Sequence, residues 1–151
     1  MNFPKYPKIP RNRLTFALLL AMIAASAHAE VVVIVSAQSP VTSLTAEQTA
    51  RIFLDKSNTF PNDGAAFPID QAEGSKARNE FYEKVVHKNP TQLSAYWARV
   101  IFTGNGQPPV ALSGNVTVRN VVANNRNAIG YIDKRYLNGS VRVVLSVENN
   151  D

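Results

Sequence analysis

The segment Ala66–Val86 constrains this chain more than any other part of the sequence. A short apolar strand leads into the turn Glu73-Gly-Ser75, and the residues after the turn have the apolar spacing of an amphipathic helix. A helix beginning at Ser75 directs its unpaired backbone N–H groups and the positive end of its dipole toward the turn. The Ser75 hydroxyl and the Arg78 guanidinium add donors there, so Gly74, Ser75 and Arg78 are predicted to bind a phosphate, sulfate or carboxylate.

Residues 1–29 have the pattern of a cleaved signal peptide rather than of a folded segment. Four basic residues precede an apolar stretch from Leu14 to Ala25, and Ala27-His-Ala29 is a small-residue cleavage site. The apolar stretch is shorter than the ~18 to 20 residues that a membrane span needs, which disfavours the alternative of a retained anchor. We therefore expect an exported protein that does not insert into a membrane once the leader is removed.

The basic charge of the sequence lies in this leader. Four of the 16 Lys and Arg, and none of the 11 Asp and Glu, fall in residues 1–29, so residues 30–151 carry 12 basic against 11 acidic groups. Nucleic-acid binding, which favours a basic surface on the folded domain, is not predicted. The sequence has no cysteine, which excludes disulfides, thiol catalysis and a lipid anchor at the cleavage point. These features together predict a periplasmic protein.

Residues 30–151 have the length of one domain, and we expect residues 148–151 to be a frayed tail. The continuous β-branched run Val31–Val35 is typical of a strand buried on both faces. Thr45 and Gln48 form a capping box for a helix that ends at Leu54, and Thr91 is predicted to cap a helix that ends near Phe102. The remaining predicted elements are a strand at 67–70, helices at 75–87 and 116–124, and strands at 128–133 and 141–147.

Strands separated by helices predict an α/β fold with a mainly parallel sheet and helices on both faces. In such sheets, ligands bind beyond the carboxyl ends of the strands. If the first two strands are parallel, the loops after Val35 and Asp70 lie at the same edge, which makes Ser39 a further candidate for anion binding.

Each candidate also has a purely structural interpretation. Ser75 is a preferred helix cap whatever the function, and Arg78 could be a solvated helix residue paired with an acidic neighbour. Ser39 precedes a proline, as is common in turns. Asp70 and Glu73 are interpreted as solvated turn residues. Known hydrolase motifs such as Gly-x-Ser-x-Gly are missing from the sequence, so an enzyme is not predicted and no cofactor or metal is implied.

Several blocks occur in the order seen in one known family. They are Ser43–Gln48 with Ile52-Phe-Leu54, the turn Glu73-Gly-Ser75, and the more specific blocks Tyr96–Gly104 and Ala128–Tyr131. In this order they resemble the phosphate-binding substrate proteins of ABC transporters, a family with the type 2 periplasmic-binding-protein-like fold. The resemblance is to short, single-lobe members. It implies one α/β lobe of a two-lobed clamp that hands its oxyanion to a membrane permease.

The family pattern at the turn is Arg-x-Asp-Gly-Ser-Gly-Thr, and this chain departs from it in part. Gly74 and Ser75 match, and Glu73 stands where the family has Asp, so it could accept a proton from hydrogen phosphate or a phosphate ester. Gln71 replaces the Arg, and Lys76-Ala77 replace Gly-Thr. A bidentate arginine makes two charge-assisted hydrogen bonds of roughly 1.5–3 kcal/mol each, so these departures predict weak binding.

The sequence thus predicts non-catalytic binding of phosphate or a similar oxyanion, as a substrate-binding or accessory component of phosphate uptake. An ABC permease or a second copy of the chain would be its partner. The alternative is a ligand-free protein-interaction module of the cell envelope that uses the same fold.

Overall fold

The structure, a computed structural model, describes residues 30–147, so the predicted signal peptide and the predicted frayed tail lie outside it. Within this range, no helix is both long enough and apolar enough to cross a bilayer. The elements are β1 (Val31–Ser36), α1 (Ala46–Phe53), β2 (Phe67–Gln71), α2 (Lys76–Phe81), the π-helix η1 (Tyr82–Val86), α3 (Pro90–Phe102), β3 (Val110–Leu112), α4 (Asn115–Ala123), β4 (Ala128–Asp133), the 3₁₀-helix η2 (Lys134–Tyr136) and β5 (Val141–Ser146).

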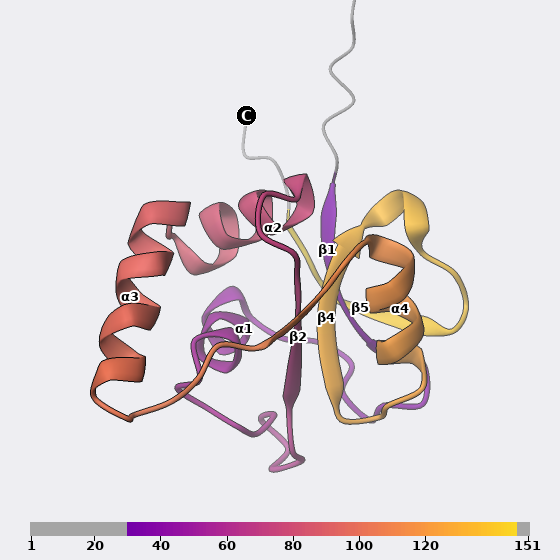
Figure 1. Cartoon of the computed structure of the whole chain (residues 1–151). Coiled ribbons are helices and arrows are strands. Elements are labelled where there is room, and N and C mark those ends of the chain that lie inside the picture. Colours follow the sequence, from indigo (N-terminus) through magenta and orange to yellow (C-terminus); the bar gives the residue numbers. More distant parts are fainter. Residues whose placement is uncertain (1–29, 148–151) are drawn as a thin grey trace, which may run out of the picture.

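One sheet with the strand order β3-β2-β4-β1-β5 organises the described chain (Figure 1). β2 is parallel to both β3 and β4, whereas β1 is antiparallel to its two neighbours, β4 and β5. Four strands therefore run in one direction and β1 runs against them. The predicted α/β fold with a mainly parallel sheet is confirmed.

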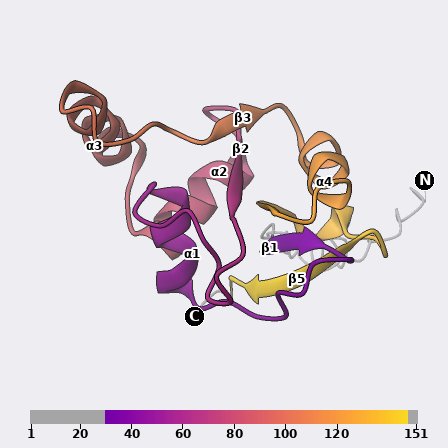
Figure 2. The same cartoon turned by 90° about the horizontal axis from the view of Figure 1, so that it is seen from below.

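Helices cover both faces of the sheet, as predicted (Figure 2). Successive side chains of β1 alternate between the faces, because side chains along a strand point to opposite sides. Val33 and Val35 pack with Phe53 of α1 and Phe81 of α2 on one face. The other face of β1 packs against α4. Its contacts there join Val32 and Ile34 with Val118 and Val122. All six residues of β1 are buried, which explains its continuous apolar sequence.

Helix α3 lies outside the layer formed by α1 and α2, on the side away from α4 (Figure 1). Buried Leu93 and Trp97 join it to the larger core, and the Tyr96 hydroxyl donates to the Leu54 carbonyl over 2.7 Å. α3 is therefore attached mainly through one apolar stripe, and it leaves a hollow between itself and the turn after β2.

Local capping signals specify the helix starts. The Thr45–Gln48 capping box of α1 is present as predicted. The predicted cap of α3 is wrong: Asn89, not Thr91, caps this helix and forms a capping box with Gln92. Pro90 occupies the first helical position, where its missing N–H costs no hydrogen bond, so the proline begins the helix rather than only ending the one before.

The predicted helix over 75–87 begins with α2 and ends in the wider turn of η1. His87 then adopts a left-handed conformation, with φ of 57°, and ends the helical segment. β3 and η2 are short elements that the sequence patterns did not predict.

The direction of β1 corrects one expectation. Val35 near the end of β1 and Pro68 near the start of β2 both pair with Ile129 of β4, so β1 ends at the edge of the sheet where β2 begins. The short helix α1 and the loop of residues 54–66 connect the end of β1 to the start of β2 at this edge. The loop after β1, which carries Ser39, and the turn after β2 therefore lie at opposite edges.

The contact between α4 and β4 yields a stability prediction. A β-carbon at Gly130 would lie 2.9 Å from Val118 Cγ1 and 3.0 Å from Val122 Cγ2. Gly130→Ala is therefore expected to lower the free energy of unfolding by about 1–2 kcal/mol through overpacking. Gly139→Ala is the matched control, since nothing lies within 4 Å of its added carbon. Urea unfolding of both variants measures the difference, and equal stabilities would contradict the packing described here.

Candidate functional site

The turn after β2 has the strand, turn and helix order predicted from the sequence. Gly74 has a φ of +84°, a conformation that glycine adopts without strain. Ser75 has extended backbone angles and caps α2, because its Oγ accepts a hydrogen bond from the Arg78 backbone N–H over 3.1 Å. Gly74 and Lys76 are exposed, so the start of α2 is accessible to solvent.

Two backbone donors at this helix start remain unpaired. The amides of Lys76 and Ala77 have no hydrogen-bond acceptor in the part of the chain that the structure describes. The Ser75 hydroxyl is already engaged, since its hydrogen points to Gln71 Oε1 at 3.3 Å. An anion here would therefore bind first to backbone amides, and it would recruit Ser75 only by displacing Gln71.

Gln71, which stands where the family pattern has arginine, is a buried structural residue with 1% exposure. Its Nε2 donates to Asn115 Oδ1 over 2.9 Å and to the Tyr131 carbonyl over 3.0 Å. Asn115 Oδ1 in turn accepts from the Asp133 backbone N–H. Gln71 thus connects the end of β2 to β4 and to the start of α4, and its two amide hydrogens are not available to an anion.

The carboxylate of Asp70 lies beneath this turn and is buried, with 3% exposure. The expectation that it is a solvated turn residue is wrong, whereas Glu73 is exposed as expected. Tyr82 donates its hydroxyl to Asp70 Oδ2 over 2.8 Å, Tyr131 donates to Oδ1, and the Gln71 backbone N–H donates to Oδ1 over 2.8 Å. Burial of a carboxylate is costly unless it is hydrogen-bonded, and these three donors meet that requirement.

Both tyrosines remain protonated donors. Burial raises the pKa of Tyr82 and of Tyr131 well above the ordinary value, and the nearby negative charge of Asp70 raises each pKa further. Neither hydroxyl therefore ionises at physiological pH. Tyr131 also stacks on Phe81 with ring centroids 4.1 Å apart, which packs the hydroxyl network against the core.

Arg78 completes the network on its outer side. Its Nε lies 3.4 Å from Asp70 Oδ2, and its guanidinium lies over the Tyr82 ring at 5.4 Å from the centroid. Arg78 is thus paired with an acidic residue, as its structural interpretation expected. Its two terminal nitrogens have no hydrogen-bond partner among residues 30–147.

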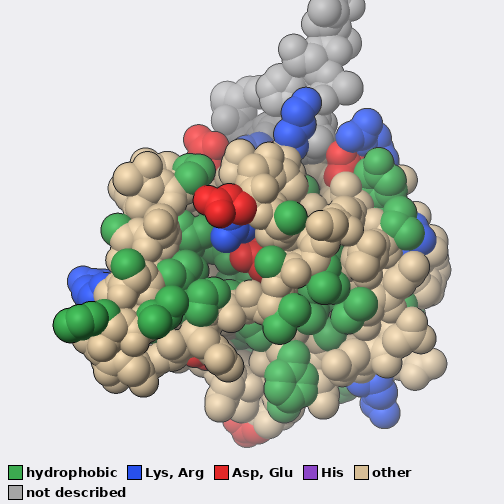
Figure 3. Space-filling model, viewed as in Figure 1, with side chains coloured by type: hydrophobic (Ala, Val, Ile, Leu, Met, Phe, Trp, Pro, Cys, Tyr) green, Lys and Arg blue, Asp and Glu red, His purple; other side chains and the backbone are tan. Residues whose placement is uncertain are grey.

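A cavity of about 180 Å³ opens beside Arg78, between the helical segment α2–η1 and the start of α3. Figure 3 shows a hollow between α3 and the sheet, on the face seen in Figure 1. Acidic and basic side chains gather at the upper end of this hollow. The cavity is lined by Glu73 and Gly74 of the turn, by Lys88 of the link between the two helical segments, and by five helical residues: Arg78, Asn79, Tyr82, Pro90 and Leu93. The structure therefore brings Gly74 and Arg78 to one cavity, whereas Ser75 is not among the residues that line it.

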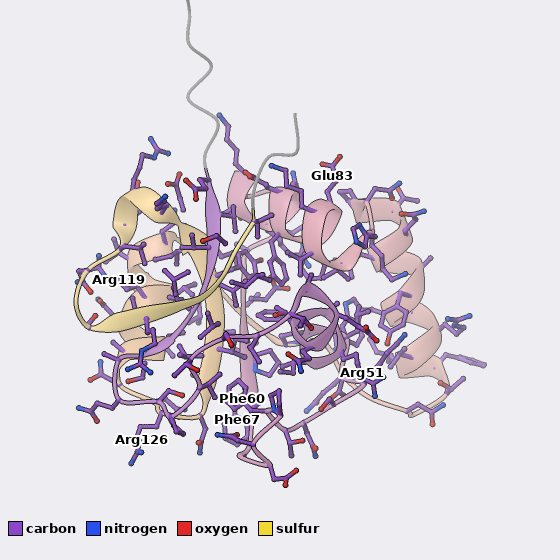
Figure 4. All side chains as sticks on the ribbon, turned by 180° about the vertical axis from the view of Figure 1, so that it is seen from behind. Arg51, Phe60, Phe67, Glu83, Arg119 and Arg126 are labelled. Atoms are coloured by element: carbon purple, nitrogen blue, oxygen red, sulfur yellow. The ribbon has the colours of Figure 1, made fainter. Side chains whose placement is uncertain are left out.

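Ser39 does not join this site. It is buried with 3% exposure, and its Oγ accepts from the Val41 backbone N–H over 3.2 Å, as expected of a turn residue. Arg126 contacts the same loop through the Gln38 carbonyl. Arg126 and Glu83 of η1 lie at opposite ends of the molecule (Figure 4). Ser39 is thus at the wrong edge of the sheet to contact an anion bound at Gly74.

Comparison with known proteins supports the resemblance seen in the sequence. No protein-family model matches the chain, and no curated protein sequence matches it significantly. The solved structures that match include a Clostridium perfringens protein described as a phosphate ABC transporter substrate-binding protein with bound phosphate, at 27% identity and a TM-score of 0.60. This chain resembles one lobe of such proteins. The alignment covers 76% of this chain and 44% of that one.

Two further structures have the same fold at lower identity. An ABC-type phosphate transport receptor from Vibrio cholerae matches at 18% identity and a TM-score of 0.60, and PstS from Borrelia burgdorferi matches at 15% and 0.57. Each aligns with 76% of this chain, and with 45% and 46% of its own length. The chain thus spans less than half the length of the structures it matches.

The hydrogen bonds to Asp70 yield a second stability prediction. Tyr131→Phe and Tyr82→Phe each remove one donor from a buried carboxylate, so each is expected to lower the free energy of unfolding by about 1.5–3 kcal/mol. Tyr136→Phe is the control, because Tyr136 is exposed and its hydroxyl makes no hydrogen bond within the described chain. Chemical denaturation at neutral pH compares the three variants. If all three unfold at the same denaturant concentration as the unaltered chain, the network does not stabilise the fold.

Proposed function

We propose that this chain binds phosphate or a closely related small oxyanion, without catalysis, at the turn formed by Gly74 and Ser75. The observation that carries the proposal is the accessible start of α2, with the unpaired amides of Lys76 and Ala77 beside Arg78. Its likeness to a phosphate-bound protein at 27% identity supports the choice of ligand. Backbone amides and an arginine at a helix start suit a tetrahedral anion.

The expected affinity is low. Neutral hydrogen bonds contribute about 0.5–1.5 kcal/mol each, and the helix dipole adds about 0.3–1 kcal/mol at an exposed site. Gln71 supplies no charge, and part of the Arg78 charge is neutralised by Asp70. Two such amide bonds, the dipole and a partly neutralised Arg78 together give a total of roughly 4 kcal/mol, which corresponds to a dissociation constant near 1 mM.

A second surface over the site would raise this affinity by excluding water. We propose that the chain acts as a substrate-binding or accessory component of phosphate uptake in the periplasm, exported by residues 1–29. An ABC permease or a second copy of the chain would cover the open side of the turn. Enclosure strengthens every electrostatic contact to the anion, because the local dielectric constant falls.

A ligand-free interaction module is the second candidate. Phe102 is 92% exposed, Val110 is 65% exposed and Phe67 is 53% exposed. Phe67 and Val110 line one hollow together, and contiguous exposed apolar surface is typical of sites that contact other proteins. On this alternative, the engagement of Gln71 and Ser75 in internal hydrogen bonds reflects a fold retained after its ligand was lost.

Isothermal titration with inorganic phosphate tests the first proposal against the second. The unaltered chain is expected to bind phosphate weakly, and Arg78→Gln to bind it about tenfold more weakly, because a charge-assisted contact is lost. Arg126→Gln is the matched control: it removes the same charge at the opposite end of the molecule and should leave the affinity unchanged. If the unaltered chain binds none of phosphate, sulfate and molybdate, the interaction module is favoured.

Glu73 provides a test of anion selectivity. Its exposed carboxylate lies at the cavity, where it can accept a hydrogen bond from the proton of hydrogen phosphate. Sulfate carries no proton at neutral pH and is repelled. We therefore expect the unaltered chain to bind phosphate more tightly than sulfate. In Glu73→Gln, the ratio of the phosphate affinity to the sulfate affinity should fall by about threefold to tenfold. Competition titrations at pH 7 measure the ratio. An unchanged ratio would show that Glu73 does not contact the anion.

A further inference from the structure

The cavity beside Arg78 extends farther than a bare oxyanion requires. Its volume is about 180 Å³. At about 30 Å³ per water molecule, it holds roughly six waters, whereas the few heavy atoms of an inorganic phosphate would fill only part of it. The cavity continues from the turn at Glu73 and Gly74 toward the start of α3.

Two basic side chains line the cavity. The Arg78 guanidinium is held by Asp70 on one side and by the Tyr82 ring beneath it, which leaves its terminal nitrogens for a ligand. Lys88 lies at the same cavity, and its Nζ is 5.5 Å from the centroid of the Tyr96 ring, with no ion pair among the described residues. Glu73, at the rim, can accept a hydrogen bond from a protonated anion.

Part of the cavity wall is apolar and rigid. Leu93 and Tyr82 are 4% and 2% exposed, so their side chains are fixed in the core while one surface of each faces the cavity. Pro90 completes this wall at the first position of α3. The Lys88 backbone N–H donates to the Tyr82 carbonyl over 3.0 Å, which fixes the link between the two helical segments. A rigid apolar wall loses little conformational entropy on binding.

We infer that this cavity binds a phosphate monoester with a small apolar substituent. The phosphate would contact Arg78 and Lys88, and the substituent would lie against Tyr82, Pro90 and Leu93. The inference rests on the proposed function, because it places the phosphate at the same turn, and it extends that function from inorganic phosphate to an organic ester. A sulfate ester or a carboxylate lacks the proton that Glu73 can accept, so a monoester near its second pKa of about 6 fits better.

Isothermal titration with inorganic phosphate and with phenyl phosphate, at equal ionic strength and at pH 5.5, where the monoester keeps its proton, tests the inference. Phenyl phosphate is expected to bind about tenfold more tightly, because its ring is removed from water. Asn79→Trp places a large side chain at the cavity from an exposed helix position, without altering the core. It should abolish the tenfold preference, because the new ring fills the space that the substituent would occupy.

The control is Val121→Trp, which adds the same ring at an exposed position of α4, on the opposite face of the sheet. It should retain the preference. Equal affinities for the two ligands in the unaltered chain would overturn the inference and leave the proposed function standing. A preference that persists in Asn79→Trp would also overturn it, since the ring would then bind elsewhere. If neither ligand binds, both the inference and the proposed function are wrong.

Discussion

The buried carboxylate of Asp70 is the interaction on which both the fold and the candidate site depend. It lies near the end of β2 and accepts hydrogen bonds from Tyr82 of η1, from Tyr131 of β4 and from the Gln71 backbone. One charged group thereby joins two neighbouring strands to the helix that follows the turn. Because a buried carboxylate must keep its donors, the positions of the turn and of the helix relative to the sheet are closely constrained.

The same network sets what the turn can bind. Arg78 is held by Asp70 and Tyr82, and it lines the cavity. Gln71, in contrast, uses its amide to connect β2 with β4 and α4. The family pattern has a phosphate-binding arginine at this position, whereas Gln71 of this chain makes hydrogen bonds within the fold. The site therefore combines neutral backbone donors with a partly neutralised guanidinium, an arrangement suited to weak or assisted binding.

In the described chain, the turn after β2 is open to solvent on one side. The solved structures that this chain resembles are more than twice as long as the part it matches. Water reaches Gly74 and Lys76 from that side, and screening by water weakens each contact to an anion. The cavity toward α3 is better sheltered, since Tyr82 and Leu93 form its wall. An apolar substituent on the phosphate would be removed from water there, which would add binding free energy that the phosphate alone does not have.

Signals that are local in sequence were enough to predict much of this protein: the buried strand β1, the capping box of Thr45, the turn at Gly74 and the cap at Ser75 all occur as expected. These features depend on residues within a few positions of one another. Only the tertiary structure decided the direction of β1, which moved Ser39 to the opposite edge, because strand direction depends on pairing with β4 far along the chain. The burial of Asp70 was decided in the same way. Its partner Tyr131 lies 61 residues away, and no local pattern connects a strand-end carboxylate with a hydroxyl at that distance.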